Sequence, residues 1–339
     1  MRHLLILFRT ATVSVLLPIT PMHLAKQFLA LCMLAPVLIG TTFGQALSHK
    51  SLFAPNTTFS YFESCDKLEE SDPADFSFQS AGYLAQCSFL IYVKEESFIE
   101  NSLAKAGFPE TQFFDESGTY AFLTKNEEHV VISFRGTESG DHADYFTDAK
   151  FKQAPFTENG TAHGGFIEAL AQIEEDLQDS LKRSLEENRN KTVWVTGHSM
   201  GGALATLFSI HNMDSVDALY TFGAPRLVGQ KLAQHLQDEL PIFRVVNNND
   251  FVCRIPSQPF YKHIGPTFFL TSDKVMIVDP PFTKAWKERL KGHRKFTKRL
   301  ISEHWLENDF SAIPSDYFVD HSPRLYAEIL IDLSKEETR

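Results

Sequence analysis

In WVTGHSMGGALATLFS, residues 194–209, a serine stands between two glycines where an apolar, strand-like run passes into an alanine-rich, helix-like run. The centre, Gly197-His198-Ser199-Met200-Gly201, fits the pattern G-x-S-x-G in the strand-turn-helix setting where that pattern presents a nucleophile. A side chain two residues before or after the serine would collide with so tight a turn, so glycines flank it. The stretch predicts a strained backbone at Ser199 with its hydroxyl above a sheet. The alternative is a serine that only caps a helix.

Short apolar runs alternate with helical patterns on both sides of this stretch. Strands separated by helices imply a largely parallel sheet with helices on both faces, and the site then lies at the carboxyl ends of the strands. The fold class predicted is therefore α/β. The expected strands cover residues 119–124, 129–134, 192–196, 218–222, 242–246 and 274–278, and the expected helices cover residues 76–92, 165–187, 201–211 and 227–240.

The composition is that of an ordinary globular protein, with 339 residues, 43% of them hydrophobic and 22% charged. A formal net charge of -11 argues against a chain-wide role in binding nucleic acid or anionic membranes, although a local basic patch stays compatible with it. Cys65, Cys87 and Cys253 can form at most one disulfide, and their spacing suggests no zinc site. We expect no metal and no organic cofactor.

The N-terminus has the layout of a signal peptide. Residues 27–49 contain no Asp, Glu, Lys or Arg and follow a lysine, which predicts a leader at residues 1–46 and a single domain at residues 47–339. An earlier apolar run, residues 4–19, makes the leader long, so that either Met22 is the effective start or the N-terminus is an uncleaved membrane anchor, the alternative to secretion. Three N-x-S/T sequons suit secretion without deciding it. They lie at Asn56, Asn159 and Asn190.

A serine nucleophile needs a histidine to take its proton and a carboxylate to orient that histidine. The favoured acid is Asp250, which follows the strand-like FRVV and the polar turn 247–249; Asp217, Asp273 and Asp279 are less well placed alternatives. The histidines after Asp250 are candidates for the base. His293 in a basic run and His304 in a helix-like segment are interpreted as solvated, so that His263 and His321 remain.

Ordered motifs across about residues 78–327 resemble the class 3 (fungal-type) lipase family of the α/β-hydrolase superfamily. They are VVISFRGTES, DYFTD, HGGFIEAL, VTGHSMGGALATL, LYTFGAPRLVG, NNNDFVCRIP, YKHIGPTFFL and DHSPRLY. The resemblance implies an α/β-hydrolase fold with Ser199 as nucleophile, Asp250 as acid and His321 as base, and it makes His263 a structural histidine. Two departures are Tyr145, where the family usually has a tryptophan, and a tyrosine displaced to Tyr326.

The resemblance also implies where the oxyanion is held and what covers the site. The backbone N–H groups of Thr137 and Met200 are the expected oxyanion donors. A lid is expected at residues 138–151, and its acidic side chains argue against strong activation at an oil surface.

Residues 284–299 carry eight Lys/Arg and one Glu in a helix-compatible pattern, which is either a solvated helix or a segment that sits on anionic lipid.

The function predicted is hydrolysis of lipid esters through a two-step acyl transfer with a Ser-His-Asp triad. A phospholipase A-type enzyme or a short-chain esterase of the same fold is the alternative. The non-enzymatic alternative is a membrane-tethered or catalytically inactive binding module. An inactive hydrolase would be expected to lose a triad residue, and all three are present. A tethered partner-binding protein would leave the DHSPRLY and GHSMGG segments unexplained. The expected partner is a lipid or ester substrate with transient lipid-surface contact, and no nucleic acid.

Overall fold

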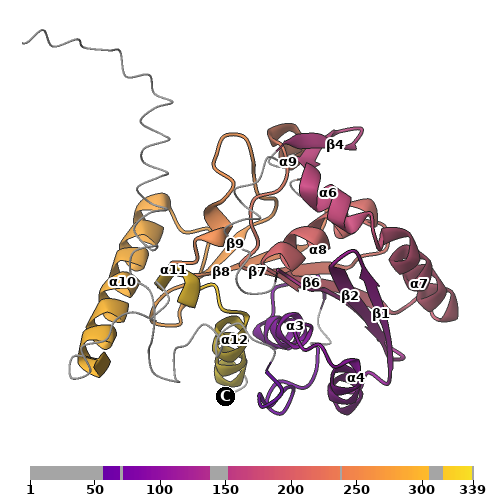
Figure 1. Ribbon diagram of the computed structural model, residues 1–339, viewed down its shortest axis with the longest axis horizontal. Helices are drawn as coiled ribbons and strands as arrows, with labels where there is room; N and C mark the ends of the chain where they lie inside the picture. The colour runs from indigo at the N-terminus through magenta and orange to yellow at the C-terminus, as the bar shows by residue number, and fades with distance from the viewer. Residues whose placement is uncertain (1–55, 69–71, 138–151, 237–238, 305–315, 338–339) are drawn as a thin grey trace, which may run out of the picture. The chain divides into compact units, whose positions relative to one another are not determined.

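The computed structural model describes residues 56–68, 72–137, 152–236, 239–304 and 316–337 (Figure 1). The chain divides into two compact units, residues 1–41 and 42–339, and all described residues belong to the second. The expected leader and lid lie outside the described residues. Within the described ranges, no helix combines the length and apolarity that a bilayer crossing needs.

The described residues form an eight-stranded sheet whose central strands are parallel (Figure 1). The strand order is β1-β2-β3-β6-β7-β8-β9-β10, with parallel pairing from β3 to β9 and antiparallel pairing among β1, β2 and β3 and between β9 and β10. A separate hairpin joins β4 and β5. The strands are β1 (Glu110–Glu116), β2 (Thr119–Lys125), β3 (His129–Phe134), β4 (Gln153–Thr157), β5 (Gly160–His163), β6 (Thr192–His198), β7 (Ala218–Phe222), β8 (Ile242–Asn247), β9 (Thr267–Leu270) and β10 (Met276–Val278).

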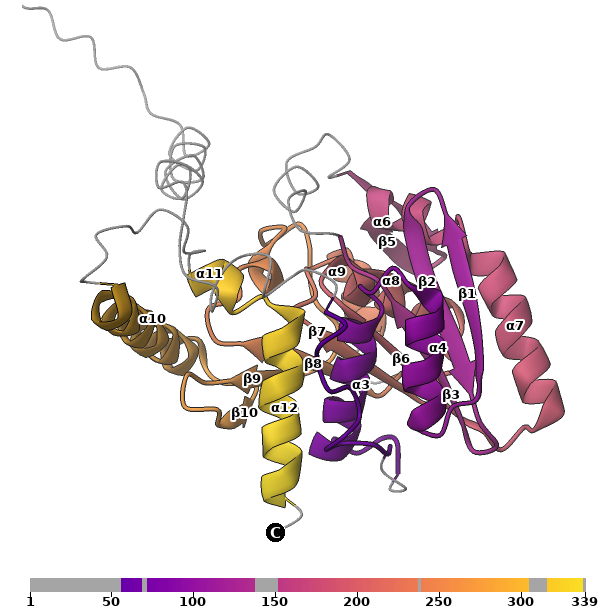
Figure 2. The ribbon, with the colours of Figure 1, turned by 60° about the horizontal axis from the view of Figure 1, so that its bottom comes forward.

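Helices cover both faces of the sheet, and successive strand residues point into two different cores. Trp194 packs in the core under α3 and α12, whereas Val193 and Val195 pack in the core under α8. Figures 1 and 2 show α3 and α12 side by side on one face. Both faces are buried, which explains the continuous apolar runs of the central strands. The helices are α3 (Phe78–Leu90), α4 (Glu96–Lys105), α6 (Gly164–Leu170), α7 (Glu174–Glu187), α8 (Met200–His211), α9 (Gln230–His235), α10 (Phe282–His304), α11 (Asp316–Val319) and α12 (Pro323–Glu337).

The α/β class and the mostly parallel sheet are confirmed, while several element boundaries were wrong. The single helix expected at residues 165–187 is two helices, α6 and α7, with tight turns where the N–H groups of Gln172 and Ile173 reach back three residues. The acidic residues 174–176 open α7, and negative charge favours a helix N-terminus at that point. The helix expected at residues 227–240 is reduced to α9.

The late strands also differ from the prediction. Only Met276–Val278 of the expected strand 274–278 is extended, because Thr271, Lys274 and Val275 close a turn through backbone hydrogen bonds. Its partner β9 was not assigned from periodicity. The prediction missed β1 as well, since Phe114 alone among its residues is buried and its sequence is mostly polar.

Candidate active site

The serine motif forms the strained turn that the sequence predicts. Ser199 has φ 59° and ψ −128° between β6 and α8, and its N–H donates to the Phe222 carbonyl of β7 at 2.9 Å. A Cβ at Gly197 would overlap the backbone of Gly201, and a Cβ at Gly201 would overlap the backbone of Phe134 in β3. Only glycines therefore let the turn close against the carboxyl ends of the strands.

Ser199, His321 and Asp250 lie in one buried hydrogen-bonded chain. His321 Nε2 is 2.9 Å from Ser199 Oγ, and His321 Nδ1 is 2.9 Å from Asp250 Oδ2. Asp250 follows β8 at the carboxyl edge of the sheet, and His321 lies between α11 and α12. The structure thus brings together the three residues that the sequence singled out, in the arrangement of a nucleophile, a base and an orienting acid.

The Asp250 carboxylate has two further hydrogen-bond donors. Asp250 Oδ1 accepts the Val252 N–H at 2.9 Å, and Asp250 Oδ2 accepts the Tyr326 hydroxyl at 2.7 Å. The Tyr326 oxygen in turn accepts the Asn247 N–H at 2.8 Å. Burial and the neighbouring Asp250 carboxylate raise the pKa of Tyr326 well above its ordinary value, so the hydroxyl keeps the proton that it donates. Tyr326 therefore fixes the carboxylate against β8.

Gly223 leaves the space in which the acid and the base meet. This glycine follows β7 and has φ +64°. A Cβ there would lie 2.7 Å from Asp250 Oδ2 and 3.0 Å from His321 Nδ1. Both its conformation and its lack of a side chain are required at this position.

His198, next to the nucleophile, holds the backbone of the base. His198 Nε2 is 2.7 Å from the His321 carbonyl oxygen, which can only accept, so Nε2 donates. With that proton on Nε2, the neutral ring accepts at Nδ1 from the Tyr92 hydroxyl, 2.9 Å away. This relay joins the loop after α3, β6 and the His321 segment. Sequence reasoning missed Tyr92, while His198 stood inside the serine motif without an assigned role.

The two expected oxyanion donors are neighbours. Thr137 follows β3, and its hydroxyl lies 3.5 Å from the Met200 sulfur. Gly136, the residue before Thr137, packs closely against the turn that carries Ser199. A Cβ at Gly136 would lie 3.2 Å from the Ser199 Cβ. This close approach places the Thr137 segment beside the serine, where donors to a developing oxyanion are needed.

The alternative acids hold other parts of the fold. Asp217 and Asp279 accept backbone N–H groups of Val193 and Thr267, and Asp273 pairs with two lysines of α10. Each of these bonds fixes a strand or a helix and does not involve a histidine. Asp250 is the carboxylate that contacts His321.

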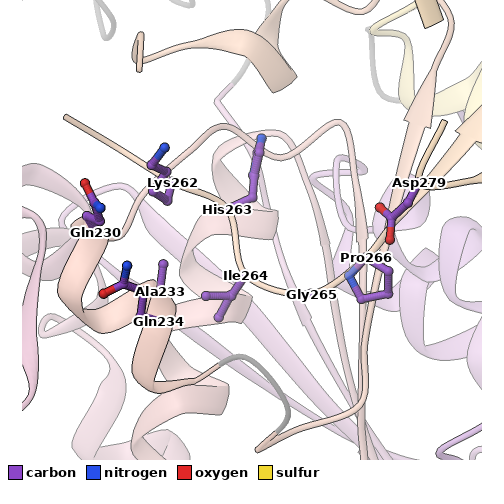
Figure 3. Close-up of a pocket in the computed structure, with 9 residues that line it drawn as sticks. All are labelled: Gln230, Ala233, Gln234, Lys262, His263, Ile264, Gly265, Pro266 and Asp279. Carbon is purple, nitrogen blue, oxygen red and sulfur yellow. The ribbon is translucent and has the colours of Figure 1, made fainter. Parts of the chain in front are cut away.

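The alternative bases lie elsewhere too. His263 Nε2 donates to the Cys253 carbonyl at 2.8 Å, and burial lowers the pKa of His263 well below its ordinary value. Figure 3 shows His263 beside an open pocket of about 590 Å³. Ser199, Asp250 and His321 do not line this pocket. His293 faces the Tyr317 ring, and the side chain of His304 lies outside the described residues.

The described part of the chain offers no group of three or more His, Cys, Asp or Glu arranged to hold a metal ion. Cys65, Cys87 and Cys253 are buried free thiols. Burial raises the pKa of Cys65 to about 11, which keeps this thiol protonated and unreactive.

A comparison with known families matches the part of the chain that carries the serine motif. Residues 131–260 match the family model Lipase (class 3), and this range contains Thr137, Ser199 and Asp250. Residues 131–260 belong to the class 3 lipase family. The resemblance of its ordered motifs to class 3 lipases is thereby confirmed, while His321 lies beyond the matched range and is placed by its contacts in the structure.

Known lipases are similar to parts of this chain. Triacylglycerol lipase OBL1 of Arabidopsis thaliana is 32% identical over 199 residues, which cover 44% of this chain and 38% of that protein. Secreted mono- and diacylglycerol lipase A of Penicillium cyclopium is 29% identical over 174 residues, 49% of this chain and 55% of that protein. The chain thus matches about half or less of the length of these relatives. The solved Rhizomucor miehei lipase propeptide complex shares the fold, with a TM-score of 0.53 and 21% identity over 70% of this chain and 80% of that one.

Proposed function

We propose that this protein is a serine carboxylic ester hydrolase that acts on lipid esters. The observation that carries the proposal is the buried series of hydrogen bonds from Ser199 through His321 to Asp250, with Ser199 on a strained turn. Relatives named as triacylglycerol lipase and as mono- and diacylglycerol lipase support glycerol esters as the substrate class.

The proposed mechanism is a two-step acyl transfer. His321 takes the Ser199 proton while Asp250 orients the ring, and the serine oxygen attacks the ester carbonyl. The N–H groups of Met200 and Thr137 stabilise the oxyanion, and His321 returns the proton to the leaving alcohol. Water then attacks the acyl-enzyme by the same route and releases the acid. These roles need no metal or organic cofactor.

The decisive variant is Ser199→Ala in the full chain, with Ser257→Ala as the control because Ser257 is exposed. We expect acid release to fall by at least about 10⁴-fold in the first variant and to stay at the wild-type level in the second. Equal activity of wild type and Ser199→Ala on every ester would refute the serine mechanism, and a folded wild type without activity would favour the binding-module alternative.

The choice of substrate separates the related activities. A triacylglycerol emulsion, phosphatidylcholine vesicles and a soluble butyrate ester would be compared at equal enzyme concentration. Preference for the emulsion supports a lipase. Preference for the vesicles or for the soluble ester supports a phospholipase A-type enzyme or an esterase instead.

Secretion with removal of residues 1–46 is a separate proposal, and exposure of the sequon residues Asn159 and Asn190 is compatible with it. N-terminal sequencing of protein recovered from the culture medium tests it. A new N-terminus near residue 47 would support cleavage. Membrane-bound protein that keeps its first residues would support the anchor.

A further inference from the structure

The helix α10 carries a charge opposite to that of the chain. Residues 284–299 contain eight Lys/Arg and one Glu, although the whole chain has a formal net charge of -11. The helix leaves the sheet after β10, and Figures 1 and 2 both show it at the margin beside α11. The triad does not involve its side chains, so its basic charge has no role in the proposed chemistry.

One stripe of α10 packs inward. Ala285, Arg289, Gly292 and Phe296 recur at intervals of four, three and four residues, which places them on one helix face. Arg289 Nε donates to the Asn248 carbonyl at 3.1 Å, and a Cβ at Gly292 would overlap the Asn248 side chain. Phe296 packs on α11. This stripe fixes the helix to the turn that precedes Asp250.

The basic stripe lies roughly opposite. Its five members are exposed and recur at intervals of three and four residues, so they share a face that turns away from the packed stripe. Lys291 is paired with Asp273, whereas no ion pair among the described residues involves the other four. The basic face consists of Lys284, Lys287, Lys291, Arg294 and Lys298.

An aromatic edge runs between the two stripes. Phe282 is 77% exposed and Trp286, one turn later, is 54% exposed. Further along the same edge, the His293 ring lies parallel to the Tyr317 ring, which is 41% exposed. Large aromatic side chains beside Lys and Arg are typical of helices that lie in the interface of a bilayer.

We propose that α10 docks on an anionic lipid surface, with its basic face on the headgroups and its aromatic edge in the interface. The charge complementarity and the exposed rings carry this proposal, and the choice of lipid over another polyanion rests on the proposed function. Tyr317 lies four residues before His321, and Arg289 holds the Asn248 turn two residues before Asp250. The helix α10 therefore connects a bilayer docked on its outer side to the segments that carry the acid and the base.

The test measures vesicle binding by the full chain with Ser199→Ala, so that the lipids stay intact. Phosphatidylcholine vesicles with and without phosphatidylglycerol are sedimented at low and high salt. Replacing Lys284, Lys287, Arg294 and Lys298 by Gln should weaken binding to the anionic vesicles at least about a hundredfold, because each basic residue near such a surface strengthens binding about fivefold. The loss should disappear at high salt, where the charges are screened.

A matched variant removes the same charge elsewhere. Lys105, Lys182, Arg189 and Lys231 are exposed on other helices and loops, and their replacement by Gln should leave vesicle binding at the wild-type level. Equal loss in the two quadruple variants, or no loss in either, would overturn the proposal. Loss of duplex DNA binding in the α10 variant with vesicle binding unchanged would also overturn it.

A local readout separates α10 from the apolar N-terminus, which is the same in every variant. In the Ser199→Ala chain, tryptophan fluorescence should be quenched by brominated phosphatidylglycerol, and the added replacement Trp286→Phe should remove most of this quenching. Unchanged quenching in the variant would refute insertion of the aromatic edge. Hydrolysis of a soluble ester is measured in parallel with the same α10 variants in the chain that keeps Ser199. Vesicle binding without hydrolysis would sink the proposed function alone, and hydrolysis without α10-dependent binding would sink the docking proposal alone.

Discussion

The variant Gly223→Ala tests whether the space between the acid and the base limits activity. A Cβ at this position would lie 2.7 Å from Asp250 Oδ2, whereas ordinary contact begins at 3.4 Å, so the carboxylate oxygen must retreat by roughly 0.7 Å. Such a retreat would lengthen the 2.9 Å bond to His321 beyond hydrogen-bonding distance. A misplacement of this size lowers the rate about a hundredfold, or about 2.7 kcal/mol in the barrier.

The positive φ of Gly223 adds a second effect that a control can isolate. A non-glycine residue in this conformation costs about 1–2 kcal/mol of stability. Gly118, in the β1–β2 turn, has φ +86°, and a Cβ added there would meet nothing within 4 Å. Gly118→Ala therefore carries the backbone strain alone. We expect it to lose stability and to keep wild-type kcat/KM.

The assay is kcat/KM on a soluble butyrate ester together with urea unfolding for wild type and both variants. Gly223→Ala should lose about a hundredfold in kcat/KM, while Gly118→Ala should stay within about twofold of wild type. A Gly223→Ala enzyme that kept kcat/KM within about threefold of wild type would refute the crowding argument. Equal loss of kcat/KM in both variants would mean that the lower kcat/KM of Gly223→Ala comes from reduced stability and not from crowding of Asp250.

Three further outcomes follow from the bonds around the triad and from one buried histidine. Tyr326→Phe should lower kcat about tenfold and unfolding free energy by about 2 kcal/mol, measured by ester kinetics and urea unfolding, because a bond to the Asp250 carboxylate is lost. Tyr92→Phe removes the hydroxyl that donates to His198 Nδ1 and so loosens the ring that holds the His321 carbonyl; kcat should fall several-fold with KM unchanged, and an altered KM alone would contradict this. Burial lowers the pKa of His163 to about 4, so the unfolded chain takes up a proton below about pH 6.5 that the folded chain refuses. Stability should therefore fall by about 2 kcal/mol between pH 7 and pH 5 through this residue, and urea unfolding of His163→Phe should show a correspondingly smaller fall.

The sequence determined the centre of the fold better than its edges. The strands β3, β6, β7 and β8 are buried on both faces, and their composition therefore records their environment. The strand β1 has one buried residue, so its pattern carries little signal. The division between α6 and α7 has no glycine or proline to mark it and depends on packing together with the acidic start of α7.

The residues of the candidate site also differ in how well the sequence alone predicts them. Ser199 was predictable because one short motif contains both the nucleophile and the glycines that its turn requires. Spacing alone left several acids and histidines open, and the contacts of Asp250 and His321 in space distinguish them. Tyr92 and Gly223 come from segments with no chemical motif, and their roles exist only in the assembled fold.

The carbonyl of His321 is held by His198, the residue next to the nucleophile. This bond holds the base in a fixed position relative to the serine turn. The 70 residues between Asp250 and His321, which include β9, β10 and α10, do not set that position. The outer face of that intervening segment is a natural place to graft or redesign surface chemistry. Exchanges there can retarget the protein to another interface while the catalytic distances are held by bonds made elsewhere.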